Sequence, residues 1–301
     1  MTSPTKPPHP QLVTRDLGPA RVTITLDAGP RIVGYVLDEH RDLFADLPNV
    51  TIDHPSMGPF RMIGGHRLWR APEIPRITYQ PDDRPVAVEQ RDDGLTVTGP
   101  PDADGIVKVI SMTQHVSLTI VDHVLRNEGP RPVRTAPWAI TQLTPGGTAI
   151  LPHGDDGDDD GVLPDRSVTV WPYTDLKDPG VSYEPGQTRV FSDDASTKWK
   201  IGQPNRAGWL AYAADGAVFV KWAPLHDEHR VYPHLGASVE FYRDRRFVEL
   251  ESLSPVDELA PGGEMAHREV WTMIEYTGDT PDDVLHDLPS DPLEGESAIA
   301  S

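Results

Sequence analysis

The chain has 301 residues and carries 47 acidic against 27 basic side chains, a formal net charge of -20. This charge repels nucleic-acid phosphates and anionic lipids, so we expect neither a nucleic-acid nor a membrane partner. The sequence has no cysteine, which excludes disulfides and thiolate sites. It has no signal-peptide core and no apolar run of about 18 residues, so we expect a cytoplasmic protein.

Short runs of alternating apolar and polar residues follow one another along the chain, separated by the 32 prolines and 25 glycines. This pattern predicts an all-β fold, a large antiparallel sandwich with few short helices. We expect one domain over residues 11–277, a disordered tail over 1–10 and an acidic, largely disordered tail over 278–301. Strands are expected over residues 22–26, 31–37, 77–80, 86–90, 95–98, 107–112, 115–126, 135–143, 168–173, 198–201, 209–213, 217–222, 239–242, 247–253 and 265–276, a loop over 43–49 and a short helix over 281–288.

The two expected strands nearest the C-terminus carry the most polar faces. Alternation places Glu249 and Glu251 on one face of residues 247–253. In the same way His267, Glu269 and Trp271 share one face of residues 265–276. Carboxylates, a histidine and a tryptophan on such faces are typical of a polar ligand site, and a solvated strand face is the alternative.

Two strand positions separate Glu249 from Glu251, which corresponds to about 6.7 Å along the backbone. Carboxyl pairs near this spacing occur in glycosidases, but there the two groups flank the scissile bond. Neighbours on one strand approach a ligand from the same side. If both groups are partly buried, their repulsion raises one pKa and favours a general base.

A glycine pair opens an earlier polar segment, residues 64–73. Gly64 and Gly65 allow the backbone to turn or to approach a ligand closely. His66 and Arg67 offer hydrogen-bond donors, and Trp69 offers a flat face that suits the C–H side of a sugar ring. The alternative is a hairpin turn with a core tryptophan and a surface histidine and arginine.

Neither group of metal-ligand residues in the sequence predicts a metal site. His226, His229 and His234 lie in a Pro-containing polar segment without a helix to align them. The acidic residues of 153–161 lack the pattern of a calcium-binding loop, and whether this segment binds calcium stays open. Because phosphate-cradling motifs are absent too, we expect neither a metal nor another cofactor.

Several segments taken together resemble the galactose mutarotase-like (aldose 1-epimerase) superfamily, and most closely its uncharacterised bacterial DUF4380 group. The resemblance spans residues 17–276. The segments that carry it are Gly64-Gly65-His66-Arg67-Leu68-Trp69, His123-Val124-Leu125-Arg126-Asn127-Glu128-Gly129, Trp171-Pro172-Tyr173-Thr174-Asp175-Leu176, Val239-Glu240-Phe241-Tyr242, Leu250-Glu251-Ser252 and Leu259-Ala260-Pro261-Gly262-Gly263.

The resemblance implies a β-supersandwich with a sugar cleft on one concave sheet. It also implies a reaction in which a carboxylate removes the anomeric hydroxyl proton while a histidine protonates the ring oxygen. Glu251 holds the place of the base. The family's histidine motif is missing from residues 135–142, so His66 or His267 would serve as the acid. The residues expected to bind substrate are Arg67, Trp69, Trp138, Glu240, Glu249 and Glu269.

Three functions follow: the partner is a small-molecule carbohydrate in the first two and a larger saccharide in the third. The first is an aldose 1-epimerase-like enzyme that interconverts sugar anomers by acid–base catalysis. The second is a non-catalytic carbohydrate-binding or regulatory protein that uses the same cleft. The third is a glycoside hydrolase or lyase. The sequence leaves the sugar and the oligomeric state open.

Overall fold

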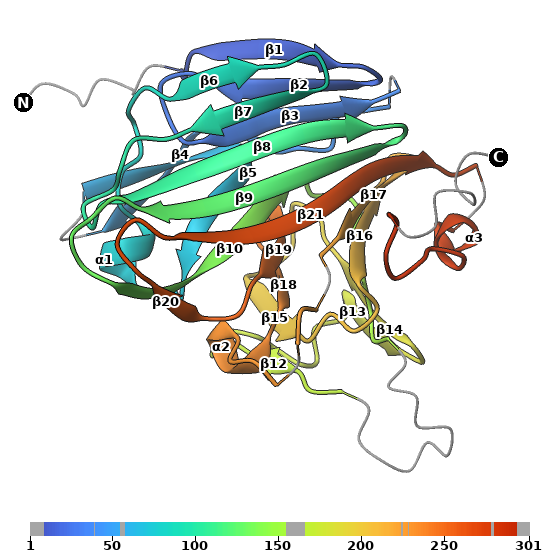
Figure 1. The fold of residues 1–301 in the computed structure, drawn as a ribbon. Coiled ribbons are helices and arrows are strands. Elements are labelled where there is room, and N and C mark those ends of the chain that lie inside the picture. The colour runs from blue at the N-terminus through green and yellow to red at the C-terminus, as the bar shows by residue number, and fades with distance from the viewer. Residues whose placement is uncertain are drawn as a thin grey trace, which may run out of the picture.

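The computed structural model describes residues 9–38, 40–54, 58–154, 166–223, 225–227, 229–277 and 280–293. Two large sheets pack face to face, and every strand pair in them is antiparallel (Figure 1). The expected antiparallel β-sandwich is therefore confirmed. Residues 1–8 of the expected N-terminal tail, 278–279 and 294–301 of the expected C-terminal tail, and 155–161 of the acidic segment lie outside the described residues.

The first sheet has eleven strands, and its central strands position the site described below. In spatial order it runs β1 (Leu12–Leu17), β2 (Ala20–Thr25), β3 (Arg31–Leu37), β5 (Gly58–Ala71), β10 (Val133–Leu143), β19 (Val248–Leu253), β18 (Val239–Arg243), β15 (Trp199–Gln203) and β12 (Thr169–Val170), with β4 (Asp46–His54) paired to β5 and β20 (Asp257–Leu259) paired to β10.

The second sheet has ten strands. Its order is β13 (Val181–Glu184), β14 (Gln187–Phe191), β11 (Thr148–Pro152), β16 (Trp209–Ala214), β17 (Ala217–Trp222), β21 (Glu264–Glu275), β9 (Leu118–Asn127), β8 (Ile106–His115), β7 (Gly94–Thr98) and β6 (Ala87–Gln90). The long strands β8, β9 and β21 run side by side across the front of the view (Figure 1).

Three four-residue helices complete the described structure: α1 (Pro75–Thr78), α2 (Pro233–Gly236) and α3 (Asp282–Leu285). None of the helices in the described parts of the chain is long and apolar enough to cross a membrane. The short helix expected over 281–288 corresponds to α3. The strand expected over 77–80 is wrong, because Pro75 presets a helical start and Tyr79 N–H bonds back to the Pro75 carbonyl. The loop expected over 43–49 is wrong from residue 46 on, where β4 begins.

The main core lies between the sheets. It gathers the inward side chains of both layers around an aromatic group formed by Tyr35, Phe44, Phe219 and Trp271. These rings meet mostly edge to face, with centroids 5.4 to 6.1 Å apart. Edge-to-face contacts of this kind favour one packing arrangement over others.

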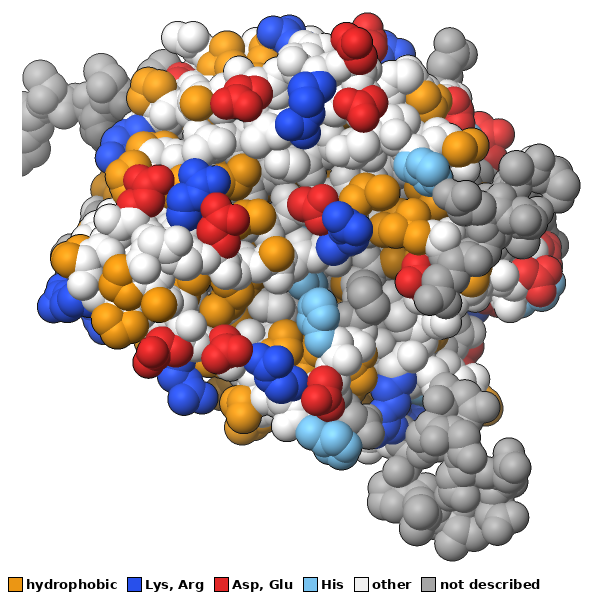
Figure 2. All heavy atoms as spheres, in the orientation of Figure 1, with side chains coloured by type: hydrophobic (Ala, Val, Ile, Leu, Met, Phe, Trp, Pro, Cys, Tyr) orange, Lys and Arg blue, Asp and Glu red, His pale blue; other side chains and the backbone are white. Residues whose placement is uncertain are grey.

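The outer face of β8, β9 and β21 is solvated. Arg268 pairs with Asp122 at 2.7 Å, and Arg126 pairs with Glu264 at 2.7 Å across the β21–β9 ladder. Figure 2 shows that acidic and basic side chains are interspersed on this face and do not gather by sign. Exposed ion pairs of this kind contribute little to stability. The ligand site lies on another part of the fold.

The glycine pair of β5 lies inside a strand and does not form a hairpin turn. Gly64 and Gly65 have φ of 100° and 65°, and Ile63 before them has φ of 61°. A Cβ atom on Gly64 would lie 1.9 Å from the Ala45 carbonyl oxygen, and one on Gly65 would lie 2.1 Å from that of Ile32. Only glycine fits both positions. The two glycines allow β5 to bend between the part that pairs with β4 and the part that carries Arg67 and Trp69.

Candidate functional site

A cleft of about 410 Å³ opens on the face of the first sheet that points away from the second sheet. Its volume falls within the range of small-molecule sites. Side chains from β4, β5, β10, β18, β19 and β15, together with the segments after β5 and β12, enclose it. The lining residues are Ile52, Met62, Trp69, Glu73, Tyr79, Trp138, Trp171, Tyr173, Lys198, Lys200, Tyr242, Arg246, Phe247 and Glu249.

Aromatic rings form the walls of the cleft. Trp69 and Trp138 are direct partners on β5 and β10, so alternation points both rings to the same side, with centroids 5.5 Å apart. Tyr79 packs edge to face on Trp69 at 5.4 Å. Trp171 lies across the cleft, and the Lys200 ammonium is 4.8 Å from its ring and 5.0 Å from that of Trp138. Aromatic rings that are buried except where they border the cleft thus surround a cation.

One carboxylate lines the cleft directly. Glu249 is 9% exposed, and its Oε1 accepts hydrogen bonds from Arg67 at 3.0 Å and from the Gln142 amide at 2.9 Å. Burial raises the pKa of Glu249, while Arg67 and Lys200 oppose the rise. Arg67 also stacks on Trp69, with its guanidinium carbon 4.2 Å from the ring. Glu249, Arg67 and Gln142 therefore form a polar floor with a preset geometry.

A second polar group lies deeper, beneath Lys200. The Lys200 ammonium contacts Glu240 at 2.7 Å and Glu251 at 2.9 Å, and the Trp138 indole N–H donates to Glu251 at 2.8 Å. Both carboxylates are fully buried, and they face each other across the β18–β19 pair. Glu251 does not line the cavity, because Trp138 and Lys200 lie above it.

Glu240 and Glu251 contact the same ammonium, but their pKa values shift in opposite directions. Burial raises the pKa of Glu251 well above its usual value. Burial also acts on Glu240, but Lys200 and His234 outweigh it and lower the pKa of that carboxyl. These carboxylates in turn raise the pKa of Lys200 well above its usual value, against the effect of its own burial. Glu240 therefore carries the negative charge, and Glu251 holds a proton more readily than an exposed glutamate.

His234 lies behind the cleft wall, against Trp138 and Trp171, and the sequence did not single it out from its neighbours. It lies in α2 with φ and ψ both 51°, and its Nδ1 donates to Glu240 at 2.6 Å. Its Nε2 accepts from the Glu73 backbone N–H at 3.1 Å. The ring packs edge to face on Trp138 at 5.2 Å. His234 thus ties the α2 segment and the start of the α1 segment to the cleft floor.

The three expected site residues His66, His267 and Glu269 lie elsewhere. All are buried between the two sheets, on the opposite side of the first sheet from the cleft. The reason is that β19 and β21 belong to different sheets, and Ser252, which contacts both His267 and Glu269, points to the back of β19. The acid role expected for His66 or His267 stays a prediction, and it would need a ligand between the sheets.

The residues between the sheets form one hydrogen-bonded cluster. His66 Nε2 meets His123 Nε2 at 2.7 Å, and His123 Nδ1 donates to the His267 carbonyl at 3.1 Å. Burial lowers the pKa of all three histidines, that of His267 to about 3. Neutral rings then form a chain in which the Thr141 hydroxyl donates to His66, and His66 donates to His123.

Glu269 is the anionic member of this cluster. Lys221 contacts it at 3.0 Å, the Trp271 indole N–H donates to it at 2.8 Å, and the Ser252 hydroxyl donates to it as well. The Lys221 ammonium holds the pKa of Glu269 below its usual value, although burial acts in the opposite direction. The opposite charges of Lys221 and Glu269 thus neutralise each other inside the protein.

Among the described residues, His66, His123 and Glu269 form a group whose ligand atoms lie within 4.8 Å of one another. The fit to a metal is poor. The two Nε2 atoms already share a hydrogen bond, and the Lys221 ammonium neutralises the carboxylate that an ion would need. A cation placed here would also be close to that ammonium.

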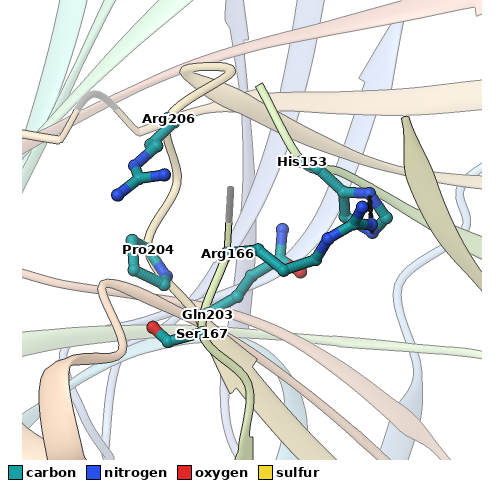
Figure 3. A pocket seen from close by; sticks show the side chains of 6 residues that line it. All are labelled: His153, Arg166, Ser167, Gln203, Pro204 and Arg206. Atoms are coloured by element: carbon teal, nitrogen blue, oxygen red, sulfur yellow. Dashed lines mark hydrogen bonds between the residues drawn. The ribbon is translucent and has the colours of Figure 1, made fainter. Parts of the chain in front are cut away.

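A much smaller cavity lies near the end of β11 and β15 (Figure 3). His153, Arg166, Gln203 and Arg206 are among its lining side chains, and Arg166 contacts the His153 ring. Its volume of about 10 Å³ corresponds to the space that one water molecule needs. It is therefore too small to be the sugar site.

Sequence reasoning found part of the cleft. Trp69, Trp138 and Glu249 line it as expected, and Arg67, Glu240 and Glu251 lie directly behind it. It missed Lys200, Tyr242 and Tyr79. The available signal for Lys200 was a lysine between the apolar residues Trp199 and Ile201, since a lysine buried on such a strand needs a carboxylate partner.

No family model and no curated protein sequence matches this chain significantly. Several solved structures are similar to it. A putative aldose 1-epimerase from Escherichia coli K12 is 9% identical, with a TM-score of 0.54 over 88% of this chain and 99% of that one. A galactose mutarotase-like protein from Lactobacillus casei is 8% identical, with a TM-score of 0.56 over 88% of this chain and 100% of that one.

A putative mutarotase from Salmonella typhimurium is 10% identical to this chain, with a TM-score of 0.56 over 88% of this chain and 90% of that one. Likeness at these identities concerns the fold alone. The chain therefore has the galactose mutarotase-like β-sandwich fold that the sequence motifs implied.

Proposed function

We propose that this protein binds a carbohydrate in the aromatic cleft of its first sheet. The observation that carries the proposal is the combination of the Trp69, Trp138 and Trp171 rings with the polar floor of Glu249, Arg67 and Gln142. The C–H face of a sugar ring packs on flat aromatic side chains, while its hydroxyls need donors and acceptors in fixed positions. The fold of the putative aldose 1-epimerases supports the same ligand class.

The expected specificity is for a sugar that does not depend on a phosphate group. Lys200 is the most central cation of the cleft, but Glu240 and Glu251 already contact its ammonium. Arg67 is likewise held by Glu249, and Arg246 by Asp244 at 2.7 Å. A phosphate would compete with these carboxylates for three of the four cations; the fourth, Lys198, contacts only the Tyr173 ring among the described residues. A neutral saccharide requires no such exchange.

A ligand screen tests this proposal. Thermal unfolding of the purified protein is measured with monosaccharides, uronic acids and short oligosaccharides. A ligand present at about 100 times its Kd should stabilise the protein by about 2.7 kcal/mol. If no saccharide in the panel shifts the unfolding temperature, the proposed ligand class is wrong.

Acid–base interconversion of sugar anomers is the second candidate function. Two cleft groups are placed for it: Glu249 reaches the cavity with a raised pKa, and Lys200 lines the same cavity in its charged form, although its raised pKa makes it a weak acid. Glu249 would remove the proton of the anomeric hydroxyl, and Lys200 would protonate the ring oxygen, so that the ring opens and recloses. In this proposal Glu249 takes the base role that the resemblance gave to Glu251, because Glu251 does not line the cavity.

The base role predicts a specific loss of rate. Glu249→Gln should slow anomer interconversion of a bound sugar by about 10²–10⁴-fold, the contribution typical of a positioned general base. The measurement is the relaxation of optical rotation. Glu249→Asp serves as control, since it keeps a carboxylate and should retain part of the rate. Equal rates for Glu249→Gln and the unchanged protein, with sugar binding intact, would leave the non-catalytic carbohydrate-binding function.

A further inference from the structure

The aromatic rings that line the cleft form two separate groups, and the first consists of three tryptophans. Trp69 and Trp138 lie 5.5 Å apart between ring centroids. Trp171 shares the Lys200 ammonium with Trp138, since this cation is 4.8 Å from one ring and 5.0 Å from the other. Trp69, Trp138 and Trp171 are the tryptophan group.

The second group, the tyrosine group, consists of Tyr173, Tyr242 and Phe247. Tyr242 packs edge to face on Tyr173 at 6.5 Å, and its ring centroid is 5.7 Å from that of Phe247. Tyr173 is 39% exposed, which makes it the most exposed aromatic residue of the cleft lining. Among the described residues, no ring of this group is in contact with a ring of the tryptophan group.

The strand register sets the distance between the two groups. Trp138 pairs with Leu253 of β19, and Tyr242 pairs with Glu249 of the same strand. Positions 249 and 253 are about 13 Å apart along the strand, and alternation puts their side chains on the same face. Tyr242 also leans away from Trp138, because it packs on Phe247, which precedes the other end of β19.

One sugar ring is too small to contact both groups. A six-membered ring with bonds of about 1.5 Å extends about 6 Å together with its hydroxyls, and two linked rings extend about twice as far. Polar groups lie between the two aromatic groups. Glu249 lines the cleft there, and the Lys200 ammonium contacts Glu251, halfway between positions 249 and 253. Hydroxyls near the linkage between two sugar units would meet these polar groups.

We propose that the cleft binds a saccharide of at least two sugar units, one on the tryptophan group and the next on the tyrosine group. The inference rests on the proposed carbohydrate function and specifies its ligand class. Two cations border the tyrosine group. The Lys198 ammonium is 4.9 Å from the Tyr173 ring, and the Arg246 guanidinium carbon is 5.5 Å from the Phe247 ring. Their N–H groups can donate hydrogen bonds to hydroxyls of the second unit.

Calorimetric titration with monosaccharides and disaccharides tests the inference. The probes are methyl glucoside, methyl galactoside and methyl mannoside, and the disaccharides maltose, cellobiose, lactose and mannobiose. At least one disaccharide should bind at least about tenfold more tightly than the methyl glycosides of its own units, because the second ring adds contacts to the tyrosine group. If every disaccharide binds no more tightly than its monosaccharides, the inference is wrong and the proposed carbohydrate function stands. If no probe binds, both fail together.

Tyr173→Ala tests where the second unit binds. Tyr173 lies in a segment outside the strands, so the fold should be kept, which thermal unfolding checks. The ratio of the monosaccharide Kd to the disaccharide Kd should fall from about tenfold or more to below about threefold. Tyr173→Phe keeps the ring and should retain most of the ratio, and Tyr183→Ala, at an exposed tyrosine of β13, should leave it unchanged. A disaccharide preference that survives Tyr173→Ala would overturn the assignment of the second unit to the tyrosine group.

Discussion

Lys221→Met should lower the free energy of unfolding by about 3–5 kcal/mol, the range observed when one partner of a buried ion pair is removed. Lys221 and Glu269 are both fully buried and 3.0 Å apart. Without the ammonium, the carboxylate keeps only the Ser252 and Trp271 donors in a medium that solvates charge poorly. The Lys221 ammonium also donates to the Leu250 carbonyl at 3.0 Å, so the variant loses a contact between the sheets as well.

Two further variants decide the cause of this loss. The double variant Lys221→Met/Glu269→Gln removes both charges and should be more stable than Lys221→Met alone. Lys177→Met, at an exposed position, should change the free energy of unfolding by less than about 0.5 kcal/mol. Denaturant unfolding measures all three. If the double variant is no more stable than the single one, the uncompensated charge of Glu269 is not the reason for the loss.

Stability should fall as pH decreases from about 6.5, and the cluster between the sheets is the reason. Burial lowers the pKa of His66, His123 and His267 in the folded protein, that of His267 to about 3. Below the unfolded value of about 6.5 the unfolded chain therefore binds more protons than the folded protein. Each such histidine removes up to about 1.4 kcal/mol of stability per pH unit until its folded pKa is reached.

Two carboxylates on β19, Glu249 and Glu251, act in the opposite direction. Burial raises the pKa of Glu249 and Glu251, so the folded protein takes up protons there as pH falls, which offsets part of the loss. To isolate the contribution of a histidine, the free energy of unfolding of His267→Gln is compared with that of the unchanged protein between pH 6.5 and 4. The variant should show a shallower decline, by up to about 1.4 kcal/mol per pH unit. Identical slopes would mean that His267 does not stay neutral in the folded protein.

The period-two pattern predicted most of the fold. It gave the long β8–β9 hairpin, and it put Glu249 and Glu251 on one face of β19 and His267, Glu269 and Trp271 on one face of β21. Each of these faces is found in the structure. The same pattern cannot say which sheet a strand joins, because strand pairing depends on contacts between distant segments. This is why the polar faces of β19 and β21 belong to two separate clusters.

Local patterns could not find Lys200 and His234, the partners of the deeper carboxylates Glu240 and Glu251. Lys200 and Glu251 are 51 residues apart in sequence, and only the β18–β19 and β15–β18 pairings bring them together. His234 reaches Glu240 through a left-handed turn that the sequence Pro233-His234-Leu235-Gly236 does not specify by itself. By contrast, Trp69 and Trp138 were found because their flat rings already suggested a sugar surface.

The most direct test of the cleft as a carbohydrate site is a calorimetric titration of the unchanged protein and Trp171→Ala with the saccharide that stabilises the protein most. Trp171 lines the cleft from a segment outside the strands, so its removal should leave the fold intact. Tyr183→Ala, an exposed aromatic on β13, is the control. We expect Trp171→Ala to weaken binding at least about tenfold, about 1.4 kcal/mol, and Tyr183→Ala to leave it unchanged. Equal affinity for all three proteins would contradict the account, because the sugar would then bind outside the aromatic cleft.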